Sequence, residues 1–146
     1  MSESLHTEAM ADLQARWSSA AFIRDLGIEL VDAGRGWVES ALVVTPRMGQ
    51  AHGYVHAGVV TTLADHTAGS AAATLVGPDQ GIVSVEFKVN LLRPAVGARL
   101  RCRADVLRPG RRVTVVESKV FAIDEEGGEK LVSAALLTMA VVSRKP

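Results

Sequence analysis

The stretch from Gln50 to Asp65 holds the residue types and spacing that could do chemistry in this chain. A glycine-rich loop comes directly before a long proline-free segment whose apolar residues have helical spacing. The first N–H groups of a helix lack intrahelical partners and lie at the positive end of its dipole. Such an end can stabilise a developing oxyanion. Ala57 and Gly58 have little bulk to block a carbonyl group, and the amide of Gln50 could donate to that carbonyl or hold a water molecule.

Asp65 is the second chemical feature, because it interrupts a run of small apolar residues. A carboxylate on a helix that packs against a sheet is costly unless it is paired or functional. Asp65 could activate water as a general base, or attack as a nucleophile and form an anhydride. A structural role, as a cap or as the partner of an arginine, is the alternative.

The spacing between these two features restricts how they can cooperate. Ala57 and Asp65 are eight positions apart, which is about 12 Å along a helix at roughly 1.5 Å per residue. An aspartate side chain is too short to reach the N-terminus of its own helix over that distance. If both groups act on one carbonyl, they come from different protomers. The spacing therefore predicts a homodimer with two composite sites.

The elements that must position these residues follow from the periodicity of the chain. We expect an α+β domain, in which an antiparallel sheet of about six strands faces one long helix. The pattern predicts helices at about 5–25 and 57–76, a loop at 48–54, and strands at 27–31, 37–45, 83–91, 99–106, 112–123 and 131–143. The alternation in 83–91 predicts a half-buried strand. The last three strands are joined by short turns, so they should be antiparallel neighbours.

Length and composition narrow the possible classes of function. The 146 residues correspond to one domain, and their net charge of zero gives no general attraction to nucleic acid or anionic membranes. Cys102 is the only cysteine, so no internal disulfide can form. No apolar run is long enough to span a bilayer and no secretory signal is visible, so we expect a cytoplasmic protein. The histidines at 52, 56 and 66 are too irregularly spaced for us to expect a metal site.

The order of elements and the segment GYVHAGVVTTLAD resemble the PaaI-type acyl-CoA thioesterases of the hotdog superfamily. The resemblance covers about residues 25–142. The family has Asn or Gln six residues before the histidine of an H-G-G segment, and Asp or Glu nine residues after it. Gln50, His56 and Asp65 match this spacing, whereas Ala57 replaces the first glycine of the pair.

The resemblance implies a hotdog fold, with 1–146 as a single domain, an N-terminal helix at about 5–25 and a core at about 26–143. It also implies hydrolysis of an acyl-CoA thioester, with coenzyme A as part of the substrate and no separate cofactor. Asp65 of the partner chain would be the base or nucleophile, and Gln50 would contact the thioester oxygen or the attacking water. The N–H of Ala57, with Gly58 behind it, would form the oxyanion hole. His56 would shape the loop and Ser84 would help to hold water.

Coenzyme A brings phosphate groups that need cations. Four arginines are candidates, namely Arg93, Arg108, Arg111 and Arg112, and the last three lie at a predicted turn. The resemblance further implies a homodimer that pairs into a dimer of dimers. The residues by themselves do not indicate the acyl group and do not distinguish a dimer from a tetramer.

Two other functions are compatible with the same fold. The first is a non-catalytic module that binds acyl-CoA; Asp65 argues against it, because such a module would have no need of the carboxylate. The second is a hydratase or dehydratase, which needs a convergent acid and base. Asp65 and His66 are adjacent on a helix, so we expect their side chains to diverge by about 100°.

Overall fold

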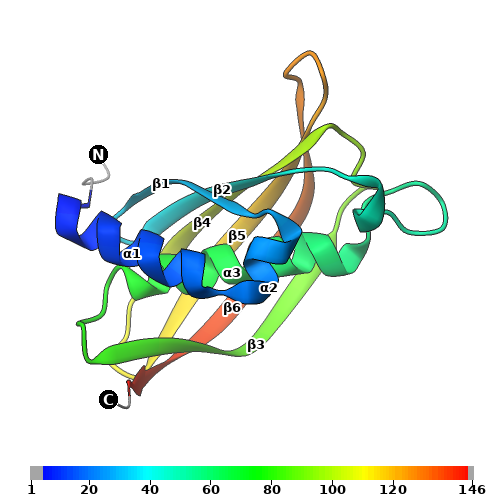
Figure 1. Cartoon of the computed structure of the whole chain (residues 1–146). Coiled ribbons are helices and arrows are strands. Elements are labelled where there is room, and N and C mark those ends of the chain that lie inside the picture. The colour runs from blue at the N-terminus through cyan, green and yellow to red at the C-terminus, as the bar shows by residue number, and fades with distance from the viewer. Residues whose placement is uncertain (1–4, 145–146) are drawn as a thin grey trace.

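The computed structural model describes residues 5–144 and has the predicted order of elements. Along the chain these are α1 (Thr7–Ser19), α2 (Ala21–Leu26), β1 (Glu29–Gly34), β2 (Trp37–Val43), the short 3-10 helix η1 (Pro46–Met48), α3 (Ala57–Ala73), β3 (Gln80–Leu91), β4 (Arg99–Arg108), β5 (Val113–Ile123) and β6 (Glu129–Ser143). The six strands form one antiparallel sheet in the order β1-β2-β4-β5-β6-β3. The sheet curves around α3, and α1 and α2 lie over α3 on the side away from the sheet (Figure 1). The predicted α+β class is confirmed.

The core lies between α3 and the inner face of the sheet. The face of α3 that meets the sheet is built from small residues, and Ala64, Ala68 and Ala71 have no exposed surface. Large apolar side chains of the strands, such as Leu100 and Leu137, fill the space opposite them. Small residues let the backbone of α3 approach the sheet closely, so the helix and the sheet pack without a gap between them.

The N-terminal segment is not the single helix that the sequence predicted for 5–25. The chain is extended at Ala20, where α1 ends, and α2 follows in a new direction. The break allows both Trp17 and Ile23 to be buried, although no Gly or Pro marks it in the sequence. Gly27, with φ of 73°, ends α2 in the left-handed conformation, so the predicted strand at 27–31 starts at Glu29 instead.

Strand β3 is the main departure from the predicted burial. The alternation predicted a half-buried strand, but Val85 and Phe87 are 61% and 46% exposed, and neighbouring residues on both faces are exposed as well. The register also shifts between Ser84 and Glu86, which leaves Val85 in a β-bulge. β3 is an edge strand, so no other strand within residues 5–144 pairs with its outer side. The prediction was wrong for the single chain for this reason.

Candidate active site

A short hook at residues 49–55 leads into α3. The Gln50 N–H donates to the Tyr54 carbonyl at 2.8 Å, and Gly53 closes the turn with φ of 83°, a conformation that favours glycine. The hook is anchored at its end by the N–H of His56, which donates to the Met48 carbonyl at 2.8 Å. The glycine-rich loop predicted from the sequence is therefore an ordered structure that fixes the entry into the helix.

Helix α3 begins at Ala57, at the residue where the sequence placed it. Nδ1 of His56 accepts a hydrogen bond from the Gly58 N–H at 2.8 Å and so caps the helix. Among the residues described, the Ala57 N–H has no such partner, which leaves it able to donate to a ligand. Within residues 5–144 only glycines have a positive φ, so the backbone at Ala57 has a conformation that alanine adopts freely. The glycine that the family has at this position is therefore not needed for the local conformation.

The side chain of Gln50 is oriented by its own loop. Its Oε1 accepts a hydrogen bond from the His52 N–H, and the amide NH₂ is left as a donor. Gln50 and Ala57 line a hollow of about 410 Å³, which we call the Gln50 pocket. Exposed Arg93 also borders it, and most of the other lining residues are apolar. This end of α3 can therefore present two donors to a carbonyl oxygen.

Asp65 lies two turns further along α3, where its Oδ1 accepts a hydrogen bond of 2.7 Å from the Ser84 hydroxyl. The bulge at Val85 follows Ser84 directly, and bulges of this kind redirect neighbouring side chains. Asp65 and Ser84 line a second hollow, of about 250 Å³, which we call the Asp65 pocket. Its other lining residues are Leu13, Arg16, Trp17, His66, Gly69, Ser70, Ala73 and Ile82.

The two pockets share no lining residue. Because α3 is helical from Ala57 through Asp65, the two residues are about 12 Å apart along its axis. The residues singled out in the sequence therefore fall into two groups within one chain. Gln50, Ala57 and Arg93 form one group, and Asp65 and Ser84 form the other.

The remaining candidate arginines lie away from Arg93. Arg108, Arg111 and Arg112 are exposed on the hairpin between β4 and β5. The Arg112 carbonyl accepts from the N–H of Val141, which pairs with Ile82 near the Ser84 end of β3. Arg93 instead follows the opposite end of β3. The four arginines thus divide between the two ends of the sheet.

Several lining residues of the Asp65 pocket were missed in the sequence. No part in the site was assigned to His66 from the sequence, yet it lines the same hollow as Asp65. Its ring packs edge-on against Trp17, with the two ring centroids 4.3 Å apart. Although Asp65 and His66 are adjacent on α3 and were expected to diverge, both side chains line the Asp65 pocket. Arg16 also lines this pocket and was not identified from the sequence. Its position between Leu13 and Trp17, the buried residues of α1, is the feature of the sequence that could have indicated it.

Two further findings concern ligands and membranes. Within residues 5–144, no group of three or more His, Cys, Asp or Glu side chains is arranged to hold a metal ion. In the same range, no helix is long and apolar enough to cross a membrane.

Comparison with known proteins assigns the family. Residues 52–129 match the model of the thioesterase superfamily. A 1,4-dihydroxy-2-naphthoyl-CoA hydrolase of Listeria monocytogenes is 32% identical over 120 residues, which is 82% of this chain and 94% of that protein. A thioesterase family protein of Silicibacter pomeroyi superposes with a TM-score of 0.90 at 30% identity, covering 93% of this chain and 99% of the other.

The PaaI protein of the phenylacetic acid degradation operon of E. coli superposes with a TM-score of 0.83 over 96% of this chain and 97% of its own, and at 21% identity it supports the fold alone. The resemblance drawn from the segment GYVHAGVVTTLAD is confirmed at the level of fold and family. The chain belongs to the thioesterase superfamily, with the hotdog fold of the PaaI type, and is a thioester hydrolase.

Proposed function

We propose that this protein hydrolyses the thioester of an acyl- or aryl-CoA to the free acid and coenzyme A, with Asp65 as the group that activates water. The hydrogen bond between Asp65 Oδ1 and the Ser84 hydroxyl carries the proposal. A carboxylate with one oxygen held by a serine and a hollow beside it can bind and deprotonate a water molecule. The Listeria relative is named as a hydrolase of a CoA thioester, which supports the same reaction class.

The chemistry then follows from the two groups of residues. The thioester oxygen accepts from the Ala57 N–H at the positive end of α3 and from the amide of Gln50, and both interactions strengthen as negative charge develops on that oxygen. Asp65 takes a proton from water while the water oxygen bonds to the carbonyl carbon. The carbon–sulfur bond then breaks, and coenzyme A leaves as the thiol after taking that proton. In the nucleophilic variant an oxygen of Asp65 bonds to the carbonyl carbon and the carbon–sulfur bond breaks, so that coenzyme A leaves as the thiolate. Water then hydrolyses the resulting anhydride to the free acid and restores the Asp65 carboxylate, and the proton released from water protonates the thiolate.

Two chains are needed to bring the groups together, and β3 is suited to pairing them. A long, exposed, apolar edge strand is a template for association with another chain. Antiparallel pairing of two β3 strands would bring the Ser84 half of one strand beside the Leu91 half of the other. Leu91 lines the Gln50 pocket, so the Asp65 pocket of one protomer would approach the Gln50 pocket of its partner.

The same pairing supports a role for the arginines in binding coenzyme A. Arg93 follows the Leu91 end of β3, and the hairpin with Arg108, Arg111 and Arg112 lies towards the Ser84 end. In an antiparallel dimer, Arg93 of one chain would flank the same site as the hairpin of its partner. Guanidinium groups from both chains would then be available to the phosphates of one coenzyme A.

Thiol release from a panel of acyl-CoAs tests the proposed reaction. We expect Asp65→Asn to lower kcat by about 100-fold or more, the lower range for a general base, and Ser84→Ala to lower it less. Asp79→Asn is the matched control, because Asp79 lies in the turn before β3 and lines neither pocket. Unchanged turnover in Asp65→Asn would refute the mechanism.

The other functions give different results in the same panel. If the wild type binds acyl-CoAs but releases thiol from none, the protein is a binding module. If it changes the absorbance of an enoyl-CoA without releasing thiol, it is a hydratase. A protein that sediments only as a monomer would refute the composite site.

A further inference from the structure

The Asp65 pocket contains polar groups that the hydrolysis of a thioester does not require. Nε of Arg16 and Nε2 of His66 are buried, and neither has a hydrogen-bond partner among residues 5–144. Both side chains line the pocket, together with the apolar side chains of Leu13, Trp17 and Ile82. A buried polar atom without a partner is unfavourable. A group on a bound ligand that supplies the missing hydrogen bonds would therefore be favoured at this place.

The two side chains are held in position by their surroundings. The indole of Trp17 donates to the Ile28 carbonyl at 2.9 Å and packs edge-on against the ring of His66. The guanidinium of Arg16 forms an ion pair of 2.8 Å with Asp12, one turn earlier on α1. The polar groups therefore occupy defined positions at the side of the pocket that α1 provides.

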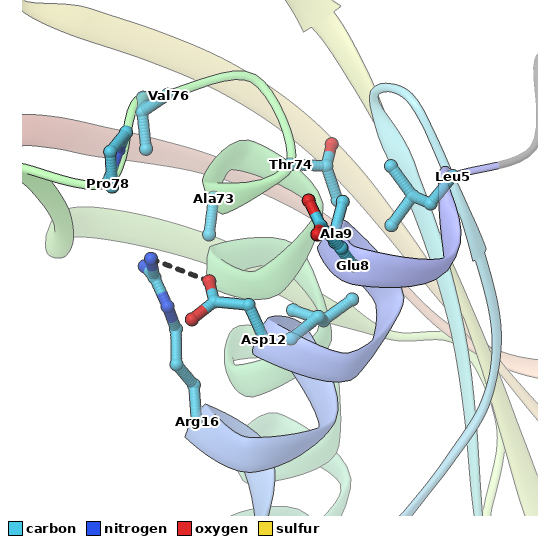
Figure 2. Close-up of a pocket in the computed structure, with 10 residues that line it drawn as sticks. Leu5, Glu8, Ala9, Asp12, Arg16, Ala73, Thr74, Val76 and Pro78 are labelled. Atoms are coloured by element: carbon cyan, nitrogen blue, oxygen red, sulfur yellow. Dashed lines mark ion pairs between the residues drawn. The ribbon is translucent and has the colours of Figure 1, made fainter.

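Arg16 also lines a neighbouring hollow, so it lies at the boundary between that hollow and the Asp65 pocket. This second hollow, which we call the α1 groove, has a volume of about 360 Å³ and lies between α1 and the C-terminal end of α3 (Figure 2). Leu13, Arg16 and Ala73 line both hollows. Figure 2 shows the side chain of Arg16 extending from α1 towards Ala73, with its guanidinium beside the carboxylate of Asp12. An acyl chain that continued from the Asp65 pocket into the α1 groove would have to displace it.

The chemistry of these groups indicates which acyl group fits. The N–H at Nε of Arg16 is a donor. Burial lowers the pKa of His66 below its ordinary value of 6.5, more than the nearby Asp65 raises it, so the ring is neutral at pH 7. The charge of Arg16 is already paired with Asp12, and Asp65 lies in the same pocket, so a second carboxylate would be repelled. A hydroxyl group suits the site, because it accepts from Arg16 and can also bond to neutral His66.

On the basis of the proposed thioester hydrolysis, we propose that Arg16 determines acyl specificity: it closes the end of the acyl pocket and, with His66, binds a hydroxyl group at the far end of a compact acyl group. The pocket volume agrees with a ring-sized group, because a cavity of roughly 150 Å³ holds a benzene ring. The short N-terminal helix α1, outside the matched family segment, thus contributes to substrate choice.

Ratios of kcat/KM for 4-hydroxybenzoyl-CoA, benzoyl-CoA and decanoyl-CoA test this role. Such ratios do not depend on the fraction of folded enzyme. Arg16→Leu keeps much of the bulk and removes the donor, so we expect the preference for hydroxybenzoyl over benzoyl to fall by roughly tenfold, the effect of one charged hydrogen bond. Arg16→Ala opens the α1 groove, so decanoyl-CoA should gain on benzoyl-CoA by a similar factor. Gln14→Ala, on the exposed side of α1, should change neither ratio.

A binding experiment separates the proposed hydrolysis from the proposed specificity role of Arg16. Calorimetry measures the binding of hydroxybenzoyl-CoA and of benzoyl-CoA to the Asp65→Asn protein, with and without Arg16→Leu. If wild type releases no thiol but the binding preference depends on Arg16, the proposed hydrolysis fails and the specificity role stands. If wild type is active and both Arg16 variants keep the wild-type ratios, the specificity role is refuted and the hydrolysis stands. If Arg16→Leu lowers kcat/KM equally for all three substrates, so that their ratios are unchanged, the specificity role is also refuted.

Discussion

The separation of Asp65 from Ala57 along α3 leads to a complementation experiment. Each composite site would take Asp65 and Ser84 from one protomer and Gln50 and Ala57 from its partner. A dimer of Asp65→Asn chains has two damaged sites, and so does a dimer of Gln50→Ala chains. A heterodimer of the two variants has one site with both defects and one site with neither. Two chains that are inactive by themselves should therefore restore activity when paired.

The size of the effect follows from the two-fold symmetry of such a dimer. Heterodimers purified through two different tags should have about half of the wild-type activity, because one of the two sites is intact. The dimer of Asp65→Asn chains should have a kcat about 100-fold or more below that of the wild type. Thiol release from an acyl-CoA that the wild type hydrolyses measures both.

The matched control pairs Asp65→Asn with Ser84→Ala. Both residues belong to the Asp65 pocket and are joined by a hydrogen bond of 2.7 Å, so in this heterodimer every site carries one defect. It should show no restoration. If the heterodimer of Asp65→Asn and Gln50→Ala has only the mean activity of its parents, Asp65 and Gln50 act within one chain and the composite site is refuted.

Three further predictions concern titration, reactivity and stability. Burial holds the pKa of His66 below 6.5, so a folded protein with neutral His66 loses stability as the pH falls below 6.5 and through the folded-state pKa. His66→Gln should flatten this decline in chemical denaturation between about pH 7 and 5, and an equally steep decline would contradict the assignment. Burial raises the pKa of the Cys102 thiol to about 11, so a disulfide reagent at pH 8 should modify it only after unfolding; rapid reaction in the native protein would contradict this. Gly110→Ala should cost about 2 kcal/mol or more, because its Cβ would lie 1.9 Å from the Val113 carbonyl oxygen. Gly69→Ala is the matched control in thermal melts, because its Cβ would meet nothing within 4 Å; equal melting temperatures of the two variants would refute the steric argument.

Much of the site's frame could be predicted because it depends on local signals. The start of α3 at Ala57 followed from a glycine-rich loop before a run of helical spacing, and the structure adds the cap that His56 provides. The separation of Ala57 from Asp65 then followed from helix geometry alone. Such features need only neighbouring residues, so a single sequence contains them.

The rest depended on contacts between distant segments. Alternation in 83–91 indicates that Val85 and Phe87 require cover from water, but it does not say which chain supplies that cover. The break at Ala20 arises because Trp17 and Ile23 must both reach the core, which no local residue signals. Arg16 joins the Asp65 pocket only because α1 folds over α3.

Polar groups in the core explain how Asp65 can be held in position on a helix whose buried face is made mostly of alanines. A contact face of alanines packs closely but offers few projections that would fix the helix along its axis. Hydroxyl groups of the sheet supply that fixation on either side of the carboxylate. Ser118 of β5 donates to the Ala64 carbonyl at 3.0 Å, and Ser40 of β2 shares a hydrogen bond of 2.6 Å with Thr67. These buried polar residues hold the turn that carries Asp65 at a fixed height above the sheet, where Ser84 of β3 can reach its carboxylate. The fold and the proposed chemistry thus depend on the same few hydrogen bonds.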